Sequence, residues 1–107
     1  MLNWIKTIFS KDPIKEFEKK SAEELRRKGR EIDYEIENMM AEAHIKEEEL
    51  ARLVERGSNA SEIEVDAIAE QCAMIEEEIK AIKDVAHTLV SIGYSAKEFE
   101  WQHRHYC

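Results

Sequence analysis

Apolar side chains recur at steps of three and four residues along most of the chain, which is the spacing of amphipathic helices. In the first half of the chain this stripe includes Leu25, Ile32, Ile36, Met39, Leu50 and Leu53. In the second half it includes Ile68, Cys72, Ile75, Ile79, Ile82 and Leu89. The pattern predicts an all-α protein with two long helices, each carrying one hydrophobic seam of the coiled-coil type.

Residues typical of helix ends set the predicted boundaries. Asp12 before Pro13 is typical of a helix start, and Gly57 suits the left-handed position that follows a helix end. Ser61 and Glu64 form the capping box of the next helix. We therefore predict helices over about 13–56 and 62–92. Because the loop between them is short, they should form an antiparallel hairpin.

Two further capping boxes and one glycine refine this prediction. The box that begins at Ser21 marks a candidate break in the first helix. Gly93 is expected to end the second helix, and the box that begins at Ser95 is expected to open a short third helix over about 96–105. Since the first helix is longer than the second, residues 13–25 should project beyond their partner unless the third helix folds back on them. We treat residues 12–107 as one domain.

Several large apolar residues lie off the predicted seams, and these favour self-association. They are Met40, Val54, Ile63 and Met74. A two-helix hairpin buries only one stripe of each helix, and a chain of 107 residues builds only a modest core. We therefore expect a homo-oligomer or polymer, with the seams and the helix ends as its assembly surfaces.

The first eleven residues form a separate amphipathic segment. Its apolar side includes Leu2, Trp4, Ile5, Ile8 and Phe9, and its polar side includes Lys6 and Lys11. A short basic amphipathic helix of this kind binds the interface of an anionic membrane, with aromatic residues at the acyl boundary. The same pattern also suits a helix packed on the hairpin, and the sequence leaves both interpretations open.

Composition and charge narrow the class of protein. Charged residues make up 37% of the chain and aromatic residues 7%, with 3 glycines and 1 proline, which fits long helices and excludes collagen-like, linker-type and β-sandwich proteins. Residues 1–30 hold 9 Lys/Arg and 5 Asp/Glu, whereas residues 31–107 hold 7 and 19. The acidic bulk predicts no nucleic-acid partner, and the basic start is the part suited to an anionic surface.

The predicted localisation rests on three features that the sequence does not show: a membrane span, a secretory signal and a disulfide framework. No apolar run approaches the roughly 20 residues of a membrane span, and residues 1–12 are too short and too polar for a secretory signal. Cys72 and Cys107 make no disulfide framework, so both are expected to be free thiols in a reducing cytoplasm. We predict a cytoplasmic protein that associates peripherally with membranes if residues 1–11 bind lipid.

Candidate catalytic and metal-binding residues are few. His103, His105 and Cys107 could offer soft-metal ligands, but ligands two residues apart do not align on a helix. Asp84 and His87 have the spacing found in di-iron bundles, yet the first helix offers no matching Glu-x-x-His. No catalytic triad or glycine-rich phosphate loop is present. We predict no metal, no cofactor and no enzymatic activity.

Two acidic runs, Glu47–Glu49 and Glu76–Glu78, followed by Asp84, look like the paired metal-binding motifs of MazG-type nucleotide pyrophosphohydrolases. The resemblance implies Mg²⁺-dependent nucleotide hydrolysis. Ala81 stands where that family has a glutamate, so the metal cage would be incomplete. A degenerate nucleotide-binding relative of these enzymes is a remote alternative.

The order of segments over residues 1–92 resembles the ESCRT-III and phage-shock-protein-A (Vipp1-like) superfamily. The resemblance rests on the amphipathic residues 1–9, the connection 11–13, the long helix to Arg56 and the hairpin tip at 50–59. It implies a non-enzymatic protein that polymerises on membranes, with the amphipathic helix as its lipid contact. The alternative is a soluble helical oligomer that acts as an adaptor or inhibitor by binding a protein or a small ligand.

Overall fold

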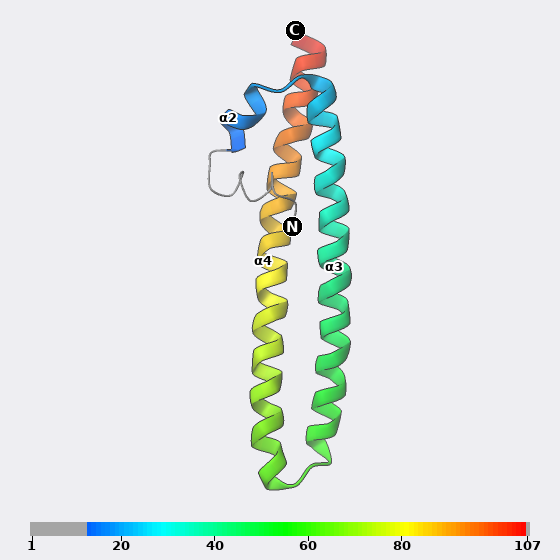
Figure 1. The fold of residues 1–107 in the computed structure, drawn as a ribbon, viewed down its shortest axis with the longest axis vertical. Coiled ribbons are helices and arrows are strands. Elements are labelled where there is room, and N and C mark those ends of the chain that lie inside the picture. Colours follow the sequence, from blue (N-terminus) through cyan, green and yellow to red (C-terminus); the bar gives the residue numbers. More distant parts are fainter. Residues whose placement is uncertain (1–12, 107) are drawn as a thin grey trace. The chain divides into compact units, whose positions relative to one another are not determined.

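A computed structural model describes residues 13–106, and it describes side chains from residue 15 onward (Figure 1). The described residues form three helices: α2 (Pro13–Glu18), α3 (Ala22–Ser58) and α4 (Glu62–Tyr106). Within this range there is no β-strand, so the predicted all-α class is confirmed. The amphipathic segment 1–11 and Cys107 lie outside the described residues.

The first predicted helix is divided into α2 and α3 by residues 19–21. The candidate break at Ser21 is therefore real, and a continuous helix over 13–56 is wrong. The Ser21 hydroxyl oxygen accepts a hydrogen bond from the backbone N–H of Glu24 at 3.2 Å, which is the N-cap bond at the start of α3. Capping at Ser21 replaces the intrahelical bonds that a continuous helix would have made.

The second helix continues through Gly93, so the predicted end at residue 92 and the separate helix over 96–105 are wrong. A Cβ atom at Gly93 would lie 3.0 Å from Cγ2 of Ile32, which is closer than ordinary packing. The glycine thus permits a close approach of α3 and α4 and does not end the helix. Ser95 is not a cap either, because its hydroxyl donates to the carbonyl of Ser91 at 3.2 Å, as mid-helix serines do.

The turn between α3 and α4 consists of residues 59–61. Gly57 lies inside α3 and does not adopt a positive φ, so its predicted left-handed role is also wrong. Side chains satisfy the last carbonyls instead. The Ser58 hydroxyl donates to the carbonyl of Val54 at 3.0 Å, and the Asn59 amide donates to that of Glu55 at 3.2 Å.

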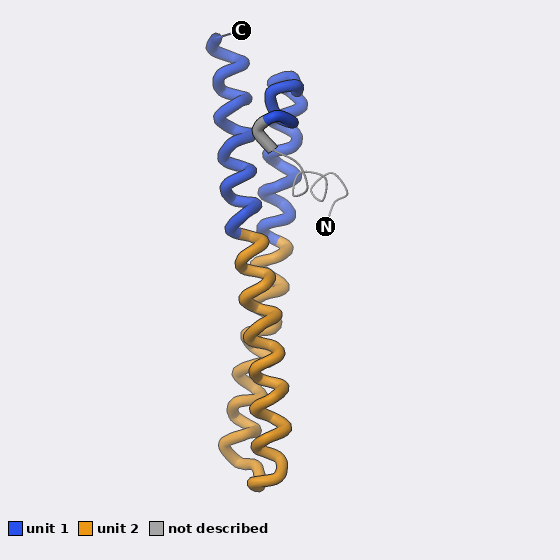
Figure 2. The backbone as a smooth tube through the Cα atoms, turned by 90° about the vertical axis from the view of Figure 1, so that its left-hand side faces the viewer, with its two compact units in different colours: residues 1–37, 87–107 blue, residues 38–86 orange. Residues whose placement is uncertain are grey.

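The chain divides into two compact units, which are coloured separately in Figure 2. Unit 2 (residues 38–86) is a helical hairpin formed by the end of α3, the turn and the beginning of α4. Its core contains Leu53, Ile68, Ile75 and Ile79, with Leu50, Ala60 and Cys72 packed against them. The predicted antiparallel pairing of the two seams is present here.

Unit 1 (residues 1–37 and 87–107) combines the beginning of α3 with the end of α4, which run antiparallel, and includes α2. Its buried apolar residues include Phe17, Leu25, Ile32, Leu89, Ile92 and Ala96. Arg104 lies 3.9 Å from Glu23, and Lys97 lies 3.2 Å from Asp33. Because α4 runs to Tyr106, its end pairs with the beginning of α3. Residues 22–25 therefore do not project, and the C-terminal residues cover them as a continuation of α4 and not as a third helix that folds back.

α2 is only six residues long, so its position depends on packing. Phe17 is 0% exposed, and its ring centroid lies 6.4 Å from that of Phe99 at an interplanar angle of 60°. This is the tilted geometry that aromatic pairs favour. Phe17 is therefore the side chain that attaches α2 to α4.

The two glycines in unit 1 make a matched test of the helix packing. Gly29→Ala should stabilise the fold by about 1 kcal/mol, because alanine favours the helix and its Cβ would meet Lys97 at an ordinary 3.8 Å. Gly93→Ala should stabilise the fold less than Gly29→Ala does, because Ile32 has to move to make room for the new Cβ atom. Gly93→Leu should lower the free energy of unfolding by about 1–3 kcal/mol, because the larger side chain overpacks the contact between α3 and α4. Urea unfolding followed by circular dichroism measures all three changes, and an equal gain from both alanine variants would contradict the close approach.

Removing the Phe17 ring should detach α2. Phe17→Ala is expected to lower the free energy of unfolding by about 3 kcal/mol, since a buried aromatic side chain is lost. Glu18→Ala, an exposed change in the same helix, is the control and should have little effect. Hydrogen exchange should show faster amide exchange in α2 of the Phe17 variant, while the turn at residues 59–61 is unchanged. Unchanged stability would show that Phe17 does not hold α2.

Candidate self-association surface

All twelve predicted seam residues are buried or half-buried within their own unit. The buried ones are Leu25, Ile32, Leu53, Ile68, Ile75, Ile79 and Leu89, and the half-buried ones are Ile36, Met39, Leu50, Cys72 and Ile82. Their apolar area is thus largely used in pairing α3 with α4. Any surface that binds another molecule has to lie elsewhere on the helices.

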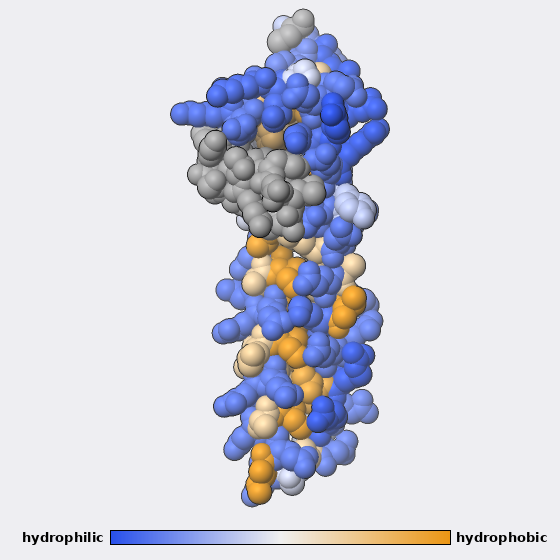
Figure 3. Space-filling model, in the orientation of Figure 1, coloured by the Kyte–Doolittle hydropathy of each residue, from blue (hydrophilic) through white to orange (hydrophobic). Residues whose placement is uncertain are grey.

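A second apolar stripe runs on α4 along unit 2. Its exposed members are Ile63, Ala67, Met74 and Ala81, and Val85 at its end is half-buried. Residues seven apart on a helix differ by about 20° in direction, and residues eleven apart by about the same angle, so the five share one side of α4. Ile63 is 89% exposed and Met74 63% exposed. Figure 3 shows apolar residues gathered along this part of the molecule, on the face that it displays.

Next to this stripe, α3 and α4 form an open groove of about 540 Å³ in unit 2. It is lined by Glu49, Arg52, Leu53 and Arg56 from α3 and by Gln71, Met74, Ile75 and Glu78 from α4. Its apolar lining residues are Leu53, Met74 and Ile75, and its charged ones are Glu49, Arg52, Arg56 and Glu78. A concave surface that combines apolar and charged side chains is typical of a site that binds a helix or another protein.

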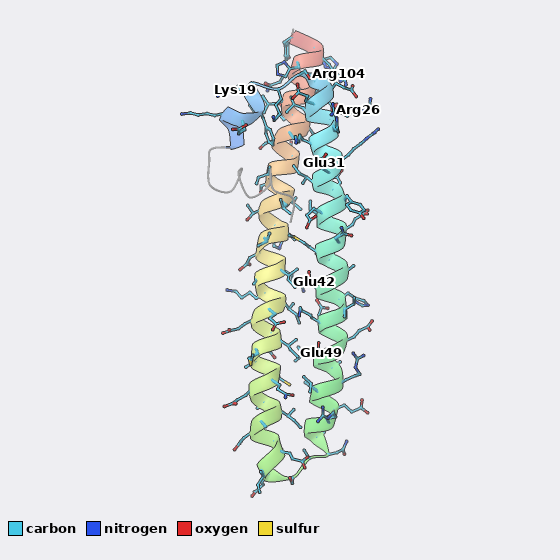
Figure 4. All side chains as sticks on the ribbon, in the orientation of Figure 1. Lys19, Arg26, Glu31, Glu42, Glu49 and Arg104 are labelled. Carbon is cyan, nitrogen blue, oxygen red and sulfur yellow. The ribbon has the colours of Figure 1, made fainter. Side chains whose placement is uncertain are left out.

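The charged residues of the groove include both signs. Arg52 and Arg56 line it, and neither has an ion-pair partner within the described part of the chain. Glu49 and Glu78 also line it, and the ammonium of Lys46 pairs with Glu78. Figure 4 shows Glu42 and Glu49 on the same side of α3. The hydrogen bond that the Lys46 ammonium donates to Glu78, together with the nearby charges of Glu42 and Glu49, raises the pKa of Lys46 despite its partial desolvation.

The net charge of the chain is confined to unit 2. That unit holds 5 Lys/Arg and 13 Asp/Glu, which gives −8, whereas unit 1 holds 11 of each. The groove itself is balanced, with two arginines and two glutamates. Most of the acidic residues of unit 2 therefore lie outside the groove, which leaves it suited to an electrically neutral contact.

The beginning of the described chain, in unit 1, carries several exposed basic residues. They include Lys15, Lys19, Arg26, Arg27 and Arg30, and Figure 4 shows Lys19 and Arg26 on different sides of the molecule. Acidic residues are interspersed among them, and Glu24 lies within hydrogen-bonding distance of the Ser21 hydroxyl. This part of the molecule can approach an anionic surface more readily than unit 2 can.

The candidate chemistry of the sequence is dispersed in the structure. Among the described residues, no group of three or more His, Cys, Asp or Glu side chains is placed to hold a metal ion. The acidic runs make surface contacts instead: Glu47 forms an ion pair with Lys83 at 3.0 Å, and a Glu48 carboxylate oxygen lies 2.9 Å from Nε2 of His44. His103 lines a small cavity, and Cys107 lies outside the described residues.

One feature that the sequence interpretation missed is an aromatic cluster at the end of α4. Trp101 stacks on His105 with ring centroids 4.2 Å apart, and Tyr106 meets Trp101 edge-on at 5.6 Å. All three side chains are exposed. The spacing of four between Trp101 and His105 is the signal that could have indicated it, since such residues are neighbours on a helix.

None of the helices in residues 13–106 has an apolar stretch long enough to cross a lipid bilayer. Comparison with known proteins gives no match: no protein-family model matches the chain, and no curated protein or solved structure is significantly similar to it.

Proposed function

We propose that this protein is a non-enzymatic scaffold, a helical hairpin that self-associates and attaches to anionic membrane surfaces through residues 1–11. The observation that carries the proposal is the exposed apolar stripe of unit 2, with Ile63 and Met74 as its largest exposed members. Large apolar side chains that stay exposed on one side of a helix indicate an interaction site. Since the seam residues are largely used in pairing α3 with α4, this stripe is a surface that a second copy could bury.

The membrane part of the proposal rests on the sequence of residues 1–11 and on the exposed basic residues of α2 and of the beginning of α3. On a helix, Trp4 and Phe9 would lie on the apolar side of this segment, and Lys6 and Lys11 on its polar side. This is the pattern of an interfacial membrane anchor. The exposed lysines and arginines of unit 1 add attraction to anionic headgroups. One eleven-residue anchor binds weakly, so several copies in an assembly would supply the affinity.

A second candidate function is that of a soluble adaptor that binds another protein. The exposed aromatic cluster of Trp101, His105 and Tyr106 favours it, because tryptophan and tyrosine dominate binding hot spots. In that case the apolar side of residues 1–11 would pack against protein and not against lipid.

Sedimentation equilibrium tests the self-association. At high micromolar concentration the full chain should sediment as a species heavier than the 12.6 kDa of one copy, because the apolar stripe of unit 2 becomes buried between copies. A constant molecular mass of one copy over the accessible concentration range would refute the scaffold.

Liposome co-sedimentation tests the membrane attachment. Wild-type protein should pellet with anionic vesicles at low salt and less so as salt is added, because added ions screen the lysines. Trp4→Glu should abolish pelleting, since a carboxylate at the acyl boundary opposes insertion. Trp101→Glu is the matched control, an exposed tryptophan elsewhere in the chain, and should pellet as the wild type does. Wild-type protein that stays in the supernatant would favour the adaptor.

A further inference from the structure

We infer that two copies of this chain pair through the groove and stripe of unit 2 in an antiparallel arrangement, related by a twofold axis at the level of Met74. In this arrangement α4 lies on α4 of the second copy and α3 lies on its α3. The inference rests on the proposed self-association and specifies its surface and its direction. It follows from three observations. They are the spacing of the apolar residues in the stripe, the charges of the residues that line the groove, and the burial of the same side of α4 in unit 1.

The stripe on α4 is symmetric about Met74. Ala67 and Ala81 lie seven residues before and after it, and Ile63 and Val85 lie eleven residues before and after it. When two such helices run antiparallel about Met74, each small alanine faces the alanine of the other copy, and each isoleucine faces a valine. Small residues let the helix backbones approach closely, while the larger ones fill the space on either side.

The groove charges follow the same symmetry. Arg52 lines the groove together with Met74, so the twofold axis passes near both. Arg56 lies four residues from Arg52 toward the turn, and Glu49 lies three residues from it in the other direction. The antiparallel arrangement therefore places Arg56 of each copy against Glu49 of the other. Arg56 gains a partner in both copies, because an interface with twofold symmetry repeats every contact. The same axis brings Arg52 of one copy near Arg52 of the other, so this pairing requires both guanidinium groups to extend outward into water.

A parallel pairing would bring like charges together. With a twofold axis along the helices, α3 of one copy would lie on α4 of the other at the same level. Glu49 would then face Glu77 and Glu78, and Glu42 would face Asp84. Like charges opposed at an interface weaken association and select against that arrangement. In the antiparallel pair, Glu70 and Glu77 fall on the outer flank of the stripe, where water screens their repulsion.

Unit 1 shows how the same side of α4 is covered when a third helix is present. The stripe continues at intervals of seven from Val85 to Ile92 and Phe99. Ile92 is buried, and Phe99 is half-buried with the ring of Phe17 from α2 beside it. In unit 2 no helix of the described residues covers the stripe. A second copy of unit 2 would supply that cover with matching apolar side chains and opposite charges.

A pair of apolar-to-glutamate changes tests the surface. Met74→Glu should weaken the association of the full chain at least about tenfold in sedimentation equilibrium, because it buries two carboxylates at the twofold axis. Val54→Glu is the matched control, since Val54 is 55% exposed in unit 2 but does not line the groove. It should associate as the wild type does. If Met74→Glu associates as strongly as the wild type does, the inferred surface is wrong, although the protein still self-associates.

Charge reversal tests the direction. Arg56→Glu should weaken association about tenfold or more, because it places glutamates opposite Glu49 of the other copy at two symmetric positions. The double variant Arg56→Glu with Glu49→Arg should regain wild-type association, since the pair is restored in reversed order. The double variant Arg56→Glu with Glu55→Arg is the control, because it also restores the net charge of −8. Glu55 does not line the groove, so the association of this control should stay as weak as that of Arg56→Glu alone.

Circular dichroism of each variant should match that of the wild type, because none of the changed residues is buried in the core of unit 2. Rescue by Glu49→Arg and not by Glu55→Arg supports the antiparallel pair. Equal rescue by both, or by neither, contradicts it. A wild-type chain that stays monomeric refutes the proposed self-association itself, and this result is distinct from failure of the charge variants.

Discussion

A pair of helices can bury only one side of each helix, and this constraint governs the whole molecule. Within each unit the seam residues of α3 and α4 pack on one another, with Leu53, Ile75 and Ile79 among the buried residues of unit 2. Everything outside the seam stays exposed unless another element covers it. In unit 1 that element is α2, attached through Phe17. In unit 2 the uncovered apolar stripe becomes the basis of the proposed function.

The sequence predicted the helices and their pairing well, because periodic apolar positions over many turns are a strong signal. It also located the break at Ser21, where a hydroxyl caps the start of α3. It failed at Gly93 and Gly57. A glycine signals a helix end by its own flexibility, but at Gly93 the tertiary contact with Ile32 decides its role. Such a contact joins residues 61 positions apart and leaves no local pattern in the sequence.

The candidate surface was only partly predictable for a similar reason. Ile63 and Met74 could be recognised from the sequence as apolar residues off the seam. That Met74 shares a groove with Arg52, Arg56 and Glu49 follows only from the register of α3 against α4. The register depends on the length of the turn, and the sequence interpretation placed that turn from a helix end at Gly57 that does not exist. Unit 2 has a net charge of −8, whereas its groove holds equal numbers of arginines and glutamates. This difference likewise becomes visible only after the helices are paired.

Disulfide cross-linking at position 74 tests the central claim most directly, namely that unit 2 binds a second copy of itself at this surface. Met74→Cys, in a chain with Cys72→Ala and Cys107→Ser, should form a covalent dimer on mild oxidation. Cysteines at the twofold axis come within the roughly 4.4–6.8 Å between Cα atoms that a disulfide requires. Val54→Cys in the same background should not cross-link efficiently. Efficient cross-linking at 54 and none at 74, in protein that still self-associates, would contradict the account.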